Sequence, residues 1–211
     1  MTMTLADYKL LVGNAATLMT ILQFLSGMLV CHKFMKKGST KDVSSLPFVT
    51  GFLSSCLWFS YGTLIEDMNI ILVNSVGMFL MMSYIGAFYI YTTRKSMIVS
   101  QLFGVVTFII CLITYFQWEL DREVFRKRFG VLASTMTTLC IAAPLSNLRQ
   151  VIRMKNSESL PFPIIFSSVM VSTLWYFYGV IIDDPFLQYP NIAGSILAFF
   201  QLSFFIIYPS R

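Results

Sequence analysis

The chain has 211 residues, of which 56% are hydrophobic and only 12% are charged, and its formal net charge is +5. A soluble domain carries about 25% charged residues, so the composition excludes an ordinary soluble domain. The charges lie in short segments between long apolar runs, which indicates membrane topology rather than a surface for nucleic acid.

Seven uncharged stretches follow one another along the chain, and each approaches the roughly 20 residues that a helix needs to cross a bilayer. In chain order they cover 10–30, 46–65, 68–91, 97–118, 129–147, 162–182 and 189–208. None of them contains Asp, Glu, Lys, Arg or His, and they are too long and too uniformly apolar for the strands of a barrel. The sequence therefore predicts an all-α membrane protein with seven transmembrane helices.

The first stretch has no basic segment before it and no cleavage-site pattern, so we expect a retained span rather than a signal peptide. The Lys and Arg residues are unevenly divided between the two sides that seven spans create. One side carries Lys33, Lys36, Lys37, Lys41, Arg94, Lys95, Arg149, Arg153, Lys155 and Arg211. The other side carries Lys9, Arg122, Arg126, Lys127 and Arg128. The positive-inside rule places the larger group in the cytoplasm, which predicts an N-terminus outside and a C-terminus inside.

The first three and the last three stretches repeat each other at a spacing of 117 residues. The matching pairs include Thr20 and Thr137, Trp58 and Trp175, Tyr61 and Tyr178, Asp67 and Asp184, Asn74 and Asn191, and Gly77 and Gly194. We therefore predict a three-helix repeat over 10–92, a linker helix over 97–118 and a second three-helix repeat over 129–208. An odd linker gives both repeats the same orientation across the membrane, so they are parallel repeats.

The repeated segments resemble the SWEET, or saliva-type, family of sugar facilitators, and among them an animal member. In the first half the resemblance rests on Gln23–Gly27, Leu46–Phe48, Leu57–Gly62 and Val73–Gly77. In the second half it rests on Ala143–Ser146, Leu160–Phe162, Trp175–Gly179 and Tyr189–Gly194. It covers nearly the whole chain and implies a transporter whose substrate site lies between the repeats, near the middle of the membrane.

The resemblance also implies the site residues. Two Trp and two Asn form the sugar pocket of the family, and the matching positions are Trp58, Trp175, Asn74 and Asn191. Four prolines mark gating bends in the family. Pro47, Pro144 and Pro161 match three of them, while Gly27 stands at the fourth position and departs from the pattern.

The chemistry of these residues suits a neutral polyol. Aromatic rings can cover its C–H faces, and amides offer donors and acceptors to its hydroxyl groups. Further candidates share a helix face with the matched positions: Ser54, Thr20, Gln23, Thr137 and Cys140. The alternatives are structural, because a Trp in a span often packs, an Asn can join helices, and a Pro at a span start can simply begin the helix.

The uncharged spans offer no proton carrier, so we expect a passive uniporter that works by alternating access. The sequence predicts no catalytic residue, no metal site, no cofactor and no nucleic-acid partner. A related carrier for another neutral solute such as an amino acid, or a sorting receptor without transport activity, remains an alternative. We expect the plasma membrane, with the Golgi as a second location. The sequence leaves open whether the sugar is a mono- or disaccharide and whether the chain forms a homo-oligomer.

Overall fold

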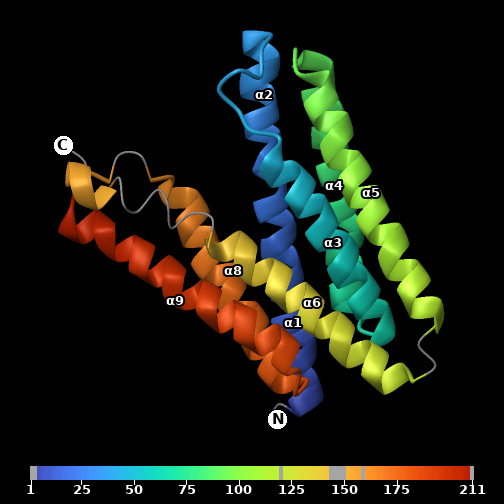
Figure 1. Cartoon of the computed structure of the whole chain (residues 1–211). Helices are drawn as coiled ribbons and strands as arrows, with labels where there is room; N and C mark the ends of the chain where they lie inside the picture. Colours follow the sequence, from blue (N-terminus) through green and yellow to red (C-terminus); the bar gives the residue numbers. More distant parts are fainter. Residues whose placement is uncertain (1–3, 119–120, 143–150, 158–159, 210–211) are drawn as a thin grey trace. The chain divides into compact units, whose positions relative to one another are not determined.

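The structure is a computed structural model, and it describes residues 4–118, 121–142, 151–157 and 160–209. Every regular element among these residues is an α-helix, which confirms the predicted all-α class. In chain order the helices are α1 (Leu5–Leu25), α2 (Gly27–Lys37), α3 (Leu46–Leu64), α4 (Met68–Tyr91), α5 (Lys95–Trp118), α6 (Arg122–Ala142), α8 (Phe162–Ile181) and α9 (Pro185–Ile207) (Figure 1).

Five helical stretches of the described chain are long and apolar enough to cross a membrane, so the protein is a multi-pass membrane protein. They are Leu5–Lys37, Met68–Tyr91, Lys95–Tyr115, Phe162–Ile181 and Pro185–Ile207. The two other predicted spans correspond to α3 and α6. Hydroxyl side chains lower the hydropathy of α3, and α6 begins with a charged segment.

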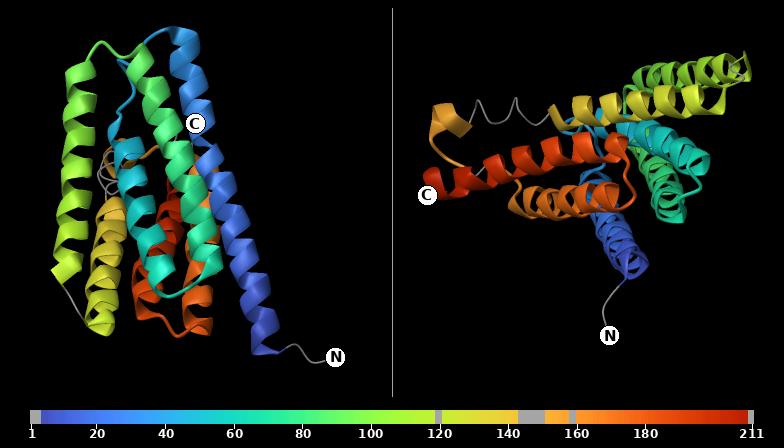
Figure 2. Two further views of the ribbon diagram at one scale, coloured as in Figure 1. Left: turned by 90° about the vertical axis from the view of Figure 1, so that its right-hand side faces the viewer. Right: turned by 90° about the horizontal axis from the view of Figure 1, so that it is seen from below.

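The chain divides into two compact units. Phe24–Gly130 forms one, called here the central unit, and Met1–Gln23 together with Val131–Arg211 forms the other, called the terminal unit. The central unit contains the antiparallel hairpin of α3 and α4, and the terminal unit contains the hairpin of α8 and α9. Figures 1 and 2 show the two helices of each hairpin side by side in all views.

The first predicted span is not one continuous helix, because the structure divides it at Ser26, between α1 and α2. The phenol of Tyr84 donates a hydrogen bond to the carbonyl oxygen of Phe24 at 3.2 Å. In a regular α-helix this oxygen would accept from the backbone amide four residues later in the chain. Gly27 leaves room for this ring, since a Cβ atom at that position would lie 2.5 Å from Cε2 of Tyr84. The departure from proline at Gly27 therefore coincides with a break that a tyrosine from α4 stabilises.

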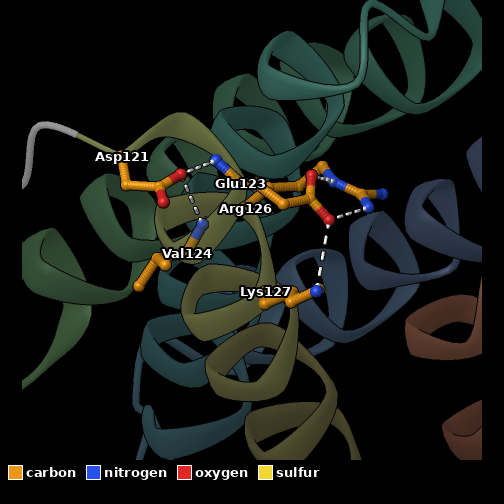
Figure 3. Close-up of polar contacts among 5 residues, drawn as sticks. All are labelled: Asp121, Glu123, Val124, Arg126 and Lys127. Carbon is orange, nitrogen blue, oxygen red and sulfur yellow. Dashed lines mark hydrogen bonds and ion pairs between the residues drawn. The ribbon is translucent and has the colours of Figure 1, made fainter.

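The basic residues on the side predicted to face outward lie at the charged start of α6, beside acidic residues. Asp121 accepts hydrogen bonds from the backbone amides of Glu123 and Val124 at 2.9 and 3.3 Å, so it caps the helix (Figure 3). Glu123 pairs with Arg126 at 2.9 Å and with Lys127 at 3.5 Å. Part of the positive charge is thus neutralised within one turn of helix.

Candidate substrate-binding site

Each hairpin holds one of the two candidate tryptophans in the same way. Trp58 on α3 is 9% exposed and meets Tyr61 edge-to-face, with ring centroids 5.6 Å apart and planes at 87°. Trp175 on α8 is 7% exposed and meets Tyr178 at 5.5 Å and 89°. Edge-to-face contacts of this kind are favourable for aromatic rings. The buried tyrosine therefore fixes the orientation of the indole in both halves.

The candidate asparagines also have the same local geometry in both halves. The side-chain amide of Asn74 donates to the carbonyl oxygen of Ile70 at 2.8 Å, and that of Asn191 donates to Leu187 at 2.8 Å. Only the nitrogen of the amide can donate, so these bonds fix which way each amide points. One N–H group and the oxygen Oδ1 of each amide remain available for a ligand.

In each hairpin the Trp and the Asn lie at the same distance from the turn, measured along their two helices. Trp58 lies eight residues before Glu66 and Asn74 lies eight residues after it, roughly 12 Å along each helix at 1.5 Å per residue. Glu66 has a left-handed backbone with φ of 56°, and Asp67 then accepts from the amides of Asn69 and Ile70 to begin α4.

The second hairpin repeats this turn. Asp183 has φ of 52°, and Asp184 accepts from the amides of Phe186 and Leu187 at 2.9 and 3.3 Å. Trp175 and Asn191 again lie eight residues to either side of Asp183. The equal spacing of Trp and Asn from the turn is a further sequence signal for these four residues, beside the 117-residue repeat.

A glycine allows close helix packing one turn beyond each asparagine. A Cβ atom on Gly77 would lie 2.6 Å from Oγ of Ser55, and one on Gly194 would lie 3.0 Å from Oγ of Ser172. Ser55 and Ser172 are themselves 117 residues apart, whereas the site residue predicted from the sequence is the neighbouring Ser54. Ser54 is half-buried, whereas Ser55 is 3% exposed.

In the terminal unit three of the candidates, Thr20, Gln23 and Trp175, take part in hydrogen bonds that join α1 to α8. The indole N–H of Trp175 donates to Oγ1 of Thr20 at 2.9 Å. The amide of Gln23 donates to Oγ of Ser168 at 2.9 Å, and a second contact to Ser167 measures 3.3 Å. Because its N–H is already bonded, Trp175 would offer a ligand its ring rather than its polar edge.

The remaining candidates lie on α6 and at the starts of α3 and α8. Thr137 and Cys140 are half-buried on α6, and the hydroxyl of Thr137 donates to the carbonyl oxygen of Ala133 at 3.1 Å. Pro47 is in the first turn of α3 and Pro161 directly precedes α8, which are positions where proline commonly begins a helix. Pro144 lies outside the described residues.

One cavity found among the described residues does not coincide with the candidates. It has a volume of about 390 Å³ and lies in the central unit between α3, α5 and the start of α6. Its wall is mostly apolar and includes Leu57, Ile109, Leu112 and Phe129. A polyol needs convergent polar groups, so this cavity is a poor match for a sugar.

The family model described as "Sugar efflux transporter for intercellular exchange" matches residues 10–96 and 127–211, which is most of the chain. The chain belongs to the SWEET family. This membership confirms the resemblance and identifies the protein as a membrane transporter rather than an enzyme.

Similar SWEET proteins cover nearly the full chain. A protein of Drosophila pseudoobscura pseudoobscura named "Sugar transporter SWEET1" is 40% identical over 99% of this chain and 93% of its own length. The protein of that name from Xenopus tropicalis is 30% identical over 96% and 95%. A rice relative named "Bidirectional sugar transporter SWEET12" is 26% identical and covers 93% of this chain and 67% of its own.

A solved SWEET structure confirms the fold. The structure of a eukaryotic SWEET transporter at 3.7 Å resolution matches with a TM-score of 0.89 and 24% identity, over 96% of this chain and 97% of that chain.

Proposed function

We propose that this chain is a uniporter that carries mono- or disaccharide sugars passively, in both directions, by alternating access. The observation that carries the proposal is the mirrored pairing of Trp58 with Asn74 and of Trp175 with Asn191. In each pair an indole held by a tyrosine and an amide oriented by a hydrogen bond within its own helix lie equally far along their helices from the hairpin turn. Membership of the SWEET family and the names of its relatives support a sugar as the substrate.

The proposed roles follow from the geometry of each side chain. The ring faces of the tryptophans cover the C–H faces of a sugar, while Oδ1 and the second N–H of each asparagine bond its hydroxyl groups. Further hydroxyl, amide and thiol groups extend the proposed site: Thr20, Gln23, Ser54, Thr137 and Cys140. The proposed gating positions are Gly27, Pro47, Pro144 and Pro161, where a weakened backbone ladder lets a helix bend.

Passive transport follows from the charge distribution. Proton relays in membranes use Asp, Glu or His within the spans, and the seven stretches contain none of these. Without a group that binds a driving ion, the sugar gradient alone sets the direction of flux. The positive-inside distribution of Lys and Arg supports an outer N-terminus and a cytoplasmic C-terminus.

The proposed arrangement has two three-helix repeats, 10–92 and 129–208, with 97–118 as the linker span. The plasma membrane is the proposed location, and the Golgi membrane is the second candidate. Immunofluorescence of a tagged chain, with and without permeabilisation, tests the location and the side on which each terminus lies.

The direct test of function is sugar flux through purified protein in liposomes. We expect labelled glucose or sucrose to equilibrate in either direction at the same level with and without a pH or sodium gradient. Accumulation of sugar against its own gradient, driven by either ion, would contradict the passive mechanism. Flux of amino acids without flux of any sugar would contradict the substrate class.

A further inference from the structure

A second, polar cavity lies in the central unit, away from every candidate sugar residue. It has a volume of about 260 Å³ and lies between the segment that follows α2 and the turn that joins α4 to α5. Its polar lining consists of Thr40, Lys41, Thr92, Thr93 and Arg94. The positive-inside rule places this end of the helices in the cytoplasm.

The two cations of this cavity lack carboxylate partners. Within the described residues, no carboxylate lies within ion-pair distance of Lys41 or Arg94. The nearest acid in sequence, Asp42, pairs with Lys37, and its hydrogen bond to that lysine lowers the pKa of its carboxyl group. The carboxyl group of Asp42 also interacts with the charge of Lys41, but a cavity lined by Lys41 and Arg94 and by no acidic residue keeps a net positive charge.

The hydroxyl groups of the cavity include an unused donor. Thr40 is only 6% exposed, and among the described residues its hydroxyl has no hydrogen-bond partner. The hydroxyl of Thr92 accepts a hydrogen bond from the backbone amide of Arg94 at 3.1 Å, so its own proton is free to be donated. The Thr40 hydroxyl keeps some accessible surface and lines the cavity, where it can donate to a ligand.

The backbone adds to this positive field. The 24-residue helix α5 begins at Lys95, next to the cavity, and its N-terminal end carries a partial positive charge. Arg94 precedes the helix and has no acceptor atom in its side chain, so it cannot cap the first amides. Two cations, hydroxyl donors and a helix N-terminus therefore surround one small cavity.

We propose that this cavity binds a phosphoryl group, presented by an inositol lipid headgroup or by a soluble phosphate compound. A phosphate supplies several acceptor oxygens with negative charge, which Lys41, Arg94 and Thr40 can bond together. A neutral sugar would leave both cations unmatched. Basic pockets at the cytoplasmic ends of membrane helices are typical sites for phosphoinositide headgroups.

The test measures binding to the purified full chain in nanodiscs of neutral phosphatidylcholine. Three probes are titrated: a short-chain phosphatidylinositol bisphosphate, inositol trisphosphate and inorganic phosphate. We expect the double variant Lys41→Gln/Arg94→Gln to lower the affinity roughly tenfold or more, and Thr40→Val to lower it severalfold. The matched control is Lys33→Gln/Lys36→Gln on α2, which removes the same charge outside the cavity.

The three probes distinguish the source of the phosphate. Binding of the lipid alone assigns the site to a membrane headgroup, whereas comparable binding of a free phosphate compound assigns it to a soluble ligand, and both outcomes support the proposal. Absence of binding for all three probes, or an equal loss in the control variant, would overturn it. Melting temperatures confirm that each variant is folded, and because no sugar is involved the result does not depend on the proposed transport function.

Discussion

The α3–α4 hairpin of the central unit and the α8–α9 hairpin of the terminal unit are built alike in their polar details. Both have an acidic residue in the left-handed conformation at the turn, an Asp cap, an indole held by a Tyr, and an Asn bonded to its own helix. The residues that recur include those with a polar or steric requirement, and some apolar neighbours such as Leu57 and Leu174 recur as well.

The hairpins differ where α9 contains Pro190 and α4 has Val73 at the equivalent place. A proline has no amide hydrogen, so the carbonyl oxygen of Phe186 loses its helical partner. The hydroxyl of Ser134 on α6 donates to that oxygen at 2.6 Å. The backbone hydrogen bond that the proline removes from α9 is therefore replaced by a side-chain hydrogen bond from α6. The two halves share their polar residues, but they differ in the contacts that stabilise their last helix.

The largest expected effect concerns the asparagines that the hairpins share. Asn74→Ala and Asn191→Ala should each weaken sugar binding roughly 5- to 150-fold, because a hydrogen bond in a desolvated site contributes about 1–3 kcal/mol. Sugar affinity and melting temperature are measured on the same purified variants.

Ser75→Ala is the matched control for Asn74. Its hydroxyl also bonds its own helix, to the carbonyl oxygen of Ile71 at 2.7 Å, but it is the neighbouring position on α4. We expect its sugar affinity to be normal. If both asparagine variants bind sugar normally and only melt earlier, the amides join helices and do not form the site.

Substitution of the glycine near each asparagine should destabilise the two hairpins to different extents. Gly77→Ala should destabilise the protein by about 1–3 kcal/mol, and Gly194→Ala by less, because the added methyl group meets Ser55 at 2.6 Å but Ser172 at 3.0 Å. Gly86→Ala on α4 is the control, since a Cβ atom there meets nothing within 4 Å and should stabilise the helix. Thermal unfolding in detergent measures all three, and equal losses at Gly77 and Gly194 would show that the tighter contact relaxes freely.

The proline in α9 gives a smaller expected effect. Ser134→Ala should destabilise the protein by about 0.6–1.7 kcal/mol, the range for hydrogen bonds between membrane helices. In a Pro190→Val background, which restores the amide, the same substitution should cost less. A double-mutant cycle of melting temperatures measures the coupling, and additive effects would mean that Ser134 does not compensate for the proline.

The smallest effect is expected at the start of α6, which has ion pairs that neither hairpin has among the described residues. The hydrogen bond from Arg126, and then its charge, lower the pKa of Glu123 below its ordinary value of 4.5. A lowered pKa means that the folded state is favoured above pH 4.5, and that this contribution is lost as the pH falls through the folded value. Glu123→Gln should therefore melt slightly earlier than the parent at pH 7 and equally at low pH, and a difference that grows on acidification would contradict this.

The amino-acid sequence was enough to predict the helical class, the 117-residue repeat of matching residues and the candidate pairs. Uncharged stretches of membrane length predict helices because lipid leaves backbone groups no other partner. The 117-residue spacing identifies Trp58 with Trp175 and Asn74 with Asn191 without any coordinates. These features depend on composition and spacing along the chain, which the sequence contains in full.

The tertiary structure alone decided which of these side chains meet. The bond from Trp175 to Thr20, the contact of Gln23 with Ser168 and the position of Tyr84 against Gly27 join residues from separate helices. Periodicity assigns a residue to a face of its helix, but the partner of that face depends on how several similar apolar helices pack. In a membrane, where lipid is as apolar as the helix surfaces, that choice is made by close fit and by a few hydrogen bonds, and neither can be read from a single helix.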